Sequence, residues 1–274
     1  MPPDKLMNLS DAIDIINNDD EITISGITFF RNPISFLTAI IKSGKKRLSF
    51  IDREPGFGLD MLVAAKSLKR VRAAMATFEH FGLSPSVRKG VEKREVEYLE
   101  DTCGAVVAGL RAGAQGIPFM PVRGILGSEL VRIHEKKGTW KVINDPFTGE
   151  EIIAVKAIEP DVAIIHLHMA DRYGNAVILG PRYEDELKIK AAKKVILTVE
   201  KVVNEEDLRK RNLELLSANS YRVEAVVSSP NGAWPTGMYP YYRPQYKAIK
   251  EYYYYAKNGN ALEWIETNLY KRWS

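Results

Sequence analysis

The sequence predicts an α/β fold, in which a mostly parallel sheet flanked by helices carries a β-rich insert and a helical C-terminal tail. Before residue 120, short apolar runs alternate with helical patterns at the spacing typical of parallel sheets. From Trp140 to Ile178 the apolar runs are separated by turns alone, which indicates a partly antiparallel insert. No repeat or low-complexity linker interrupts the chain, so we expect one domain spanning residues 1–274.

Each element is expected from a local signal. Ser10 and Asp11 precede an apolar run and predict a capped helix start, and Pro33 suits the first turn of the next helix. A Gly/Pro loop at 54–58 opens a third helix, and Asp101 with Thr102 can cap a fourth. Strands are expected at 21–25, 47–52, 70–78, 94–99, 193–203 and 223–230, and further helices at 59–68, 101–116, 183–192, 243–257 and 261–273.

The composition excludes several classes of protein. The net charge of +4 is spread over faces rich in lysine and glutamate, which indicates a solvated surface and not a nucleic-acid-binding one. Cys103 is the only cysteine, so a disulfide framework and a cysteine-based zinc cluster are excluded. The N-terminus lacks a signal-peptide pattern, and no apolar run approaches the ~18 residues of a membrane span. We therefore expect a cytoplasmic protein without a membrane partner.

Ligands of open α/β sheets bind beyond the carboxyl ends of the strands. The loops expected there are GITFFRNP, REPGFG, LEDTC, PVRGILGS and SSPNGAWPTG. Arg31 and Arg123 lie in these loops and can bind a phosphate or carboxylate, or form structural ion pairs instead. Cys103 lies just inside a helix start, which favours a thiolate, although a small buried cysteine is the commoner alternative. Four of the glycines in these loops can expose backbone donors or simply form turns, namely Gly26, Gly124, Gly127 and Gly232.

The familiar catalytic motifs are absent from the sequence. There is no GxSxG, no GxxxxGK[ST], and no GxGxxG after the first strand. His166 and His168 lie on one face of an apolar strand, but no third metal ligand is evident nearby. We interpret both histidines as side chains that form hydrogen bonds within or beside the sheet, and we predict no metal site.

Five stretches in order along the chain carry a resemblance to a known family. They are SGITFFRNP, GAVVAGLRAGAQGIPFMPVRGILGSEL, DPFTGE, DVAIIHLHMADRYGNAVI and PNGAWP. The chain resembles the alpha (A) subunit of family I CoA-transferases, especially the glutaconate CoA-transferase type, with its CoA-transferase-like (NagB/RpiA-type) fold. RNPISFLTAI and PVRGILGS are also similar to the alpha subunit of the steroid ring-opening acyl-CoA hydrolase of the same superfamily.

The resemblance implies a two-chain enzyme with its active site between an alpha and a beta subunit of similar fold. In the transferases a beta-subunit glutamate attacks the acyl-CoA, and a mixed anhydride and then a glutamyl-CoA thioester carry the group. The beta chain's Ser-Glu-Asn-Gly-like stretch is absent here, so this chain is expected to lack the nucleophile. A coenzyme A thioester and a carboxylic acid are the implied substrates, without a tightly bound cofactor.

The resemblance also implies which residues form the site. The acyl pocket would be lined by Gly26, Phe29, Phe30, Arg31, Asn32 and Cys103. The adjacent loop would be supported by Arg123, Gly124, Gly127 and Ser128. The partner and the acyl group would cover the loop residues Phe29, Phe30 and Arg31, which explains why aromatic side chains occur there.

Two departures from the family pattern leave the reaction open. In the ring-opening hydrolase an alpha-subunit glutamate does the chemistry, but Cys103 occupies that position, and Glu100 and Asp101 are out of register. The glutaconate type has histidines where this chain has Cys103 and Trp234. CoA transfer is the prediction, the hydrolysis of a cyclic acyl-CoA is the alternative, and a non-catalytic CoA-binding subunit is a third possibility.

The C-terminal tail is rich in aromatic residues, which are typical of either core packing or a subunit interface. From this density we expect alpha–beta pairs that assemble further. The residues are Tyr239, Tyr241, Tyr242, Tyr252, Tyr253, Tyr254, Tyr255, Trp264 and Trp273.

Overall fold

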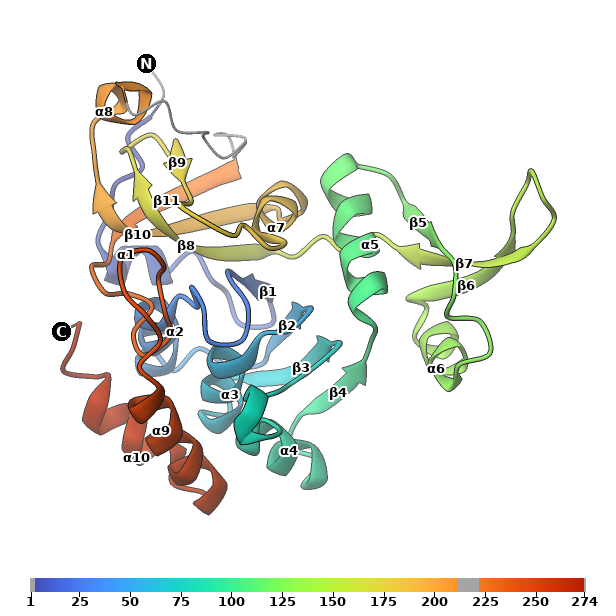
Figure 1. The fold of residues 1–274 in the computed structure, drawn as a ribbon, viewed down its shortest axis with the longest axis horizontal. Coiled ribbons are helices and arrows are strands. Elements are labelled where there is room, and N and C mark those ends of the chain that lie inside the picture. Colours follow the sequence, from blue (N-terminus) through green and yellow to red (C-terminus); the bar gives the residue numbers. More distant parts are fainter. Residues whose placement is uncertain (1–2, 211–221, 274) are drawn as a thin grey trace.

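The computed structural model describes residues 3–210 and 222–273 (Figure 1). Its main sheet has parallel strands in the order β11-β10-β8-β1-β2-β3-β4, and β9 (Ala176–Val177) pairs with β8 in the antiparallel direction. This arrangement confirms the predicted α/β class. The parallel strands are β1 (Glu21–Ile24), β2 (Leu48–Asp52), β3 (Leu68–Ala73), β4 (Glu97–Glu100), β8 (Val162–Ala170), β10 (Lys194–Val202) and β11 (Val223–Ser228).

The insert is a separate antiparallel sheet with the strand order β5-β7-β6. It comprises β5 (Phe119–Val122), α6 (Glu129–Lys137), β6 (Trp140–Asn144) and β7 (Glu151–Lys156), and it projects beyond α5 (Figure 1). The predicted bounds, Trp140 to Ile178, were wrong at both ends. The run DVAIIHLHM belongs to β8, a central strand of the main sheet whose residues are all buried. A strand that is buried on both faces has a continuous apolar sequence. The apolar run of β8, which lies between two turns, therefore resembled the strands of the insert.

Helices cover both faces of the main sheet. One face carries α2 (Ile34–Lys42), α3 (Gly56–Ala64), α4 (Pro85–Glu92), α9 (Tyr246–Asn258) and α10 (Ala261–Asn268). The other face carries α5 (Cys103–Gln115) and α7 (Asp185–Ala191), which pack on Ile51 and Ile158. The short helices α1 (Leu9–Ile13) and α8 (Glu205–Lys210) lie at the side of β10 and β11 (Figure 1). No helix in the described ranges is long and apolar enough to span a membrane.

Several helix and strand boundaries differ from those predicted. The N-cap of α1 is Asn8, whose side chain accepts a hydrogen bond from the Asp11 amide, so Ser10 and Asp11 lie inside the helix. Helix α3 begins at Gly56, within the predicted loop, and ends before β3 begins at Leu68. Thr102 caps α5 as predicted, and its hydroxyl accepts from the Ala105 amide.

The aromatic residues of the C-terminal tail divide between core and surface. Tyr252 and Trp264 are buried, and the Tyr252 ring lies 4.5 Å from that of Phe57 on α3. The Tyr252 hydroxyl donates to the buried Asp60 carboxylate at 2.8 Å, which satisfies both groups. Tyr239 and Tyr241 are exposed. Core packing therefore accounts for part of the aromatic density, and only the exposed part is available for an interface.

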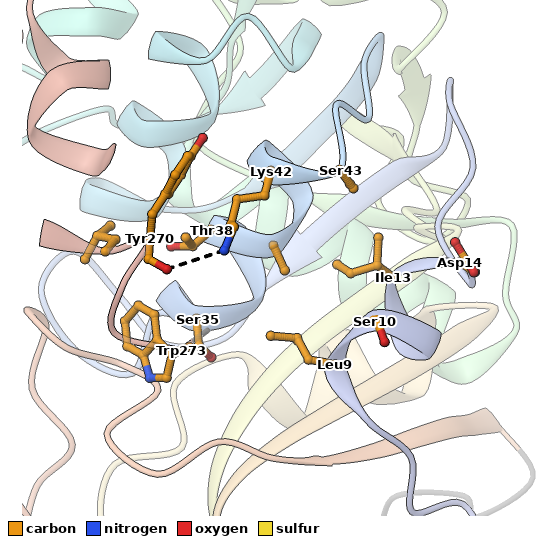
Figure 2. A pocket seen from close by; sticks show the side chains of 12 residues that line it. Leu9, Ser10, Ile13, Asp14, Ser35, Thr38, Lys42, Ser43, Tyr270 and Trp273 are labelled. Atoms are coloured by element: carbon orange, nitrogen blue, oxygen red, sulfur yellow. Dashed lines mark hydrogen bonds between the residues drawn. The ribbon is translucent and has the colours of Figure 1, made fainter. Parts of the chain in front are cut away.

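A pocket of about 410 Å³ lies between α1, α2 and the C-terminal segment. The Lys42 ammonium donates a hydrogen bond to the Tyr270 carbonyl oxygen at 3.4 Å (Figure 2). Ser35 and Thr38 lie on the same helix as Lys42 and also line the pocket. Trp273 lies at the end of the pocket (Figure 2). None of its lining residues belongs to the cleft described below.

Helix α5 is held against the chain that leaves the insert through close backbone contacts at its glycines. The Ile158 amide donates to the Gly109 carbonyl at 2.9 Å. A Cβ atom at Gly113 would lie only 2.2 Å from the Ile158 carbonyl oxygen, so this approach requires glycine. The contact fixes α5 relative to the main sheet and positions its N-terminus at the carboxyl edge.

We expect Gly113→Ala to destabilise the chain by about 1–3 kcal/mol, because the added methyl group overlaps the Ile158 carbonyl. The matched control is Gly104→Ala on the same helix, where a Cβ atom would meet nothing within 4 Å. There the better helix propensity of alanine predicts no loss, or a gain of up to about 1 kcal/mol. Urea denaturation measures the free energy of unfolding of both variants, and equal values for the two would contradict the packing argument.

Candidate active site

A cleft of about 590 Å³ lies beside α5, at the carboxyl end of β2. This is the edge of an open α/β sheet where ligands bind. One wall is the exposed face of α5, the other is β5 of the insert, and Arg53 and Glu184 line it from the segments that follow β2 and precede α7. The lining residues are Arg53, Cys103, Gly104, Val107, Ala108, Arg111, Met120, Pro121, Val122 and Glu184.

Cys103 is the first residue of α5 and a free, exposed thiol. The buried cysteine that the sequence allowed as the commoner alternative is therefore wrong. Its side chain lines the same cleft as the Arg53 guanidinium. The thiol thus lies in the cleft together with a cation, at the N-terminal turn of a helix.

Arg53 forms ion pairs with two carboxylates at the site. Its Nε lies 2.9 Å from Oε1 of Glu184, and its Nη1 lies 3.5 Å from Oε2 of Glu54. Burial raises the pKa of Glu54, and the nearby negative charge of Glu79 raises it further. The site therefore contains one guanidinium held between two carboxylates, next to the cysteine thiol.

Arg31 and Arg53 both lie in loops expected at this edge, but only Arg31 was predicted to be a site residue. Arg31 is buried, and its Nη1 lies 2.6 Å from Oδ2 of Asp185, whose side chain is 0% exposed. Its Nη2 donates to the Pro181 carbonyl at 2.9 Å. Of the two alternatives left open for Arg31, the structure shows the ion pair, which braces the loop after β1 against α7.

The rest of the loop after β1 is also packed within this chain. Phe29 is 2% exposed, and its ring lies 5.5 Å from that of Phe78 in an edge-to-face contact. The side-chain oxygen of Asn32 accepts a hydrogen bond from the Gly58 amide at 2.9 Å. Gly26 has a φ of +79°, and a Cβ atom there would lie only 1.9 Å from the Phe30 carbonyl oxygen. Contrary to expectation, the chain itself covers Phe29 and Arg31. The acyl-binding role of this loop stays a prediction, and half-buried Phe30 is its more accessible aromatic residue.

A second buried ion pair lies beneath this loop and was missed by the sequence analysis. The Lys188 ammonium lies 2.8 Å from Oδ1 of Asp52 and donates to the Ile24 carbonyl at 2.7 Å. Lys188 and Asp52 are 0% and 2% exposed. The available signal was the position of Asp52 at the carboxyl end of β2, together with a lysine on the buried face of α7. These contacts tie α7 to the ends of both strands.

The predicted loop at 123–128 follows directly after the β5 wall. Arg123 is exposed and lies 3.2 Å from both Asp145 and Glu150, so it forms ion pairs within the insert. Gly124 and Gly127 have φ values of +89° and +82°, and Ser128 caps α6 by accepting from the Leu130 amide. The loop shapes the insert, and its supporting role in substrate binding stays a prediction.

Both histidines of β8 form hydrogen bonds through both ring nitrogens. His166 lies 2.8 Å from the Thr198 hydroxyl and 2.9 Å from Oε1 of Glu200. His168 accepts from the Leu179 amide at Nδ1 and donates to the Tyr239 carbonyl from Nε2. The interpretation of the two as structural histidines is therefore confirmed. His168 attaches the segments that follow β9 and β11 to the centre of the sheet, and His166 joins β8 to β10.

The chain is similar to several known proteins. A family model described as coenzyme A transferase matches residues 6–229. The chain is 31% identical over 245 residues to the A subunit of 3-oxoadipate CoA-transferase from Pseudomonas knackmussii, a match that covers 87% of this chain and 83% of that protein. It is 30% identical over 253 residues to the IpdA subunit of the cholesterol ring-cleaving hydrolase from Mycobacterium tuberculosis, over 88% of this chain and 84% of that one.

The chain is also 33% identical over 272 residues to an uncharacterized protein of Archaeoglobus fulgidus. That match covers 97% of this chain but only 60% of the archaeal protein, which is therefore considerably longer.

Two solved structures share the fold over 97% of this chain. Glutaconate coenzyme A-transferase from Acidaminococcus fermentans superimposes with a TM-score of 0.90 at 26% identity, over 89% of its chain. A cysteine-to-serine variant of the decarboxylase AibA/AibB superimposes with a TM-score of 0.87 at 28% identity, over 98% of its chain. The similar proteins are therefore named for three different reactions, which are CoA transfer, hydrolysis and decarboxylation.

We expect Arg31→Met to destabilise the chain by about 3–5 kcal/mol, because the buried Asp185 carboxylate loses the cation at 2.6 Å and keeps only the Lys188 ammonium at 3.9 Å. The double variant Arg31→Met/Asp185→Asn removes both charges but keeps an acceptor for the Gly26 amide, so it should be more stable than the single variant. Arg47→Met breaks an exposed pair with Asp19 and should cost less than about 1 kcal/mol. Urea denaturation gives the values, and a double variant less stable than Arg31→Met would refute this account.

The stability of the chain should fall between pH 6.5 and pH 4 through His168. Burial lowers the pKa of His168 to about 4, so in this range the unfolded chain binds a proton at this ring and the folded chain does not. Urea denaturation from pH 7.5 to pH 4 should show a shallower loss for His168→Gln. The exposed His80 provides the control variant His80→Gln. A His168→Gln profile parallel to that of the unmodified chain would disprove this.

Proposed function

This chain belongs to the coenzyme A transferase family, and from that premise we propose that it is the alpha subunit of a two-chain enzyme that moves CoA between carboxylic acids. In this proposal a beta subunit supplies the catalytic glutamate. The alpha chain supplies the cleft beside α5, in which the acyl thioester lies. No cofactor beyond the CoA thioester substrate is required.

The observation that carries the proposal is the chemistry of the cleft lining. It holds a thiol and two guanidinium groups, and its one carboxylate, Glu184, is already paired with Arg53 at 2.9 Å. A carboxylate held by a guanidinium is a weak nucleophile toward a thioester. The cleft can therefore bind and polarise a substrate, whereas the attacking carboxylate must come from outside its lining. The 3-oxoadipate CoA-transferase relative is named as one subunit of its enzyme, which fits such a division of labour.

The proposed reaction begins with attack of the partner glutamate on the thioester carbonyl. The carbon–sulfur bond breaks, CoA leaves as its thiolate, and an acyl–glutamyl anhydride remains. The thiolate then attacks the glutamyl carbonyl, which forms glutamyl-CoA and releases the first acid as its carboxylate. Repetition of the two steps in reverse with a second acid gives the new acyl-CoA. Arg53 would stabilise the oxyanion that develops on the thioester carbonyl.

Hydrolysis of a cyclic acyl-CoA is the second candidate, favoured by one specific observation. Glu184 is a carboxylate of this chain that lines the same cleft as Cys103. It reaches the cleft from the segment before α7, and not from the start of α5, where the resemblance implies the glutamate of the ring-opening enzyme. With Arg53 displaced by a ligand, Glu184 would be available as a base toward water. Likeness to the ring-cleaving hydrolase agrees with this alternative.

Co-expression of the chain with the gene of its partner tests the proposal. The complex should release little free CoA from an acyl-CoA until an acceptor acid is added, and borohydride should convert a partner glutamate to the alcohol expected from a glutamyl thioester. We expect Arg53→Gln to lower kcat by about 10²–10³, since it removes an oxyanion donor. Arg70→Gln, which changes an exposed arginine on β3 outside the cleft, should leave kcat unchanged.

Other outcomes would separate the alternatives. Rapid release of CoA without any acceptor, abolished by Glu184→Gln, would support the hydrolase. Binding of acyl-CoA without turnover would indicate a non-catalytic role. Turnover by the isolated chain would contradict the two-chain proposal altogether.

A further inference from the structure

The wall of the cleft formed by α5 has a cation that the proposed chemistry does not use. Cys103, Val107 and Arg111 follow one another at intervals of four residues, so they share one face of the helix, and all three line the cleft. Arg111 is exposed, and no acidic side chain among the described residues lies within ion-pair distance of it.

The other arginines of this region are neutralised. Arg53 is paired with Glu184, Arg31 with Asp185, and Arg123 with Asp145 and Glu150. The cleft lining therefore carries two guanidinium groups against one carboxylate, which leaves one positive charge, located at Arg111. The neighbouring wall is apolar, formed by Val107 and by Met120, Pro121 and Val122 of β5. An unpaired guanidinium above an apolar wall suits a ligand that has a hydrocarbon body and a distant anionic group.

We propose that Arg111 is a specificity residue, which binds a second carboxylate carried by the acyl group at the end remote from the thioester. The inference rests on the proposed function, since it deepens the description of the same cleft. It predicts that the enzyme prefers CoA thioesters of dicarboxylic acids to those of monocarboxylic acids of equal length.

The geometry of α5 supports a carboxylate some distance from the reacting carbonyl. Arg53 and Cys103 lie at the N-terminal end of the helix, and Arg111 is eight residues further on, a rise of ~12 Å along the axis. Helical side chains lean toward the N-terminus, so we expect the Arg111 guanidinium to lie nearer to Arg53 than this rise. An acyl chain of several carbons would extend along Val107 and Met120 between the two guanidinium groups.

An anion of CoA itself is the other possible occupant, because phosphate and carboxylate share the same recognition by arginine. The pantetheine arm holds the phosphates far from the thioester, beyond the span between Arg53 and Arg111. The carboxylate therefore fits better. The two sources make different predictions, because a phosphate is present in every acyl-CoA substrate whereas the second carboxylate is present only in some.

The test uses the complex of both subunits, with adipate and hexanoate as acceptors and adipyl-CoA and hexanoyl-CoA as donors. We expect Arg111→Gln to lower kcat/KM for the adipate pair by about tenfold or more and to leave the hexanoate pair within about twofold, since one charge-assisted contact is lost. Arg111→Lys should retain part of the preference, because lysine keeps the charge but not the bidentate geometry. The control is Arg88→Gln, an exposed arginine of α4 outside the cleft.

Each outcome decides the inference separately from the proposed function. An unchanged adipate-to-hexanoate ratio in Arg111→Gln would overturn it, and an equal loss for both acids would overturn it in favour of a CoA phosphate. If the complex transferred CoA to no acid at all, the proposed function would fail. Calorimetric titration of adipate into the complex would still test Arg111, because weaker adipate binding by Arg111→Gln, with no such loss in Arg88→Gln, would support the inference and equal binding would oppose it.

Discussion

The buried ammonium group of Lys188 is the interaction on which the carboxyl edge of the sheet depends. It neutralises Asp52 at the end of β2 and donates to the Ile24 carbonyl at the end of β1, so a single side chain from α7 joins two neighbouring strands. A buried charge without a partner costs several kcal/mol, so both members must be present and correctly placed. Asp185, on the same helix, repeats the arrangement with Arg31. Helix α7 thereby fixes the loop after β1 and positions Glu184 beside Arg53.

Within this small region, some charged side chains are buried in ion pairs that hold the fold together, whereas others border the cleft. Arg31 and Lys188 are enclosed with their carboxylates, and their electrostatic contribution goes into holding backbone segments together. Arg53 is paired but borders the cleft, and Arg111 is exposed without a counter-charge among the described residues. Residue type alone does not distinguish these four cations. They are distinguished by the identity and distance of the nearest carboxylate, because pairing determines whether a cation can still attract a ligand.

Family membership constrains the fold and the general chemistry more strongly than the reaction. A CoA thioester is attacked by a carboxylate in a transferase and by water in a hydrolase, and both reactions need a polarised carbonyl in a cleft of this kind. Relatives at about 30% identity are named for either reaction, and one structural neighbour is named as a decarboxylase. The difference depends on a few groups around the reacting carbonyl, and in the proposed two-chain enzyme some of them would belong to the partner, which is why the fold cannot decide it.

The sequence by itself determined the α/β class, the cap of α5 by Thr102 and the family, because these depend on local alternation, capping chemistry and the order of five short stretches. It did not determine the limits of the insert, since β8 has the same turn-flanked apolar pattern as the strands of the insert and only its pairing with β1 and β10 distinguishes it. Nor did it show which arginine is enclosed and which is free. Asp185 and Arg31 are far apart in the chain, and Arg53 meets Glu184 only because α7 packs across the ends of β1 and β2. Contacts between such distant residues exist only in the folded molecule, and here they decide which charged side chains of this region are paired.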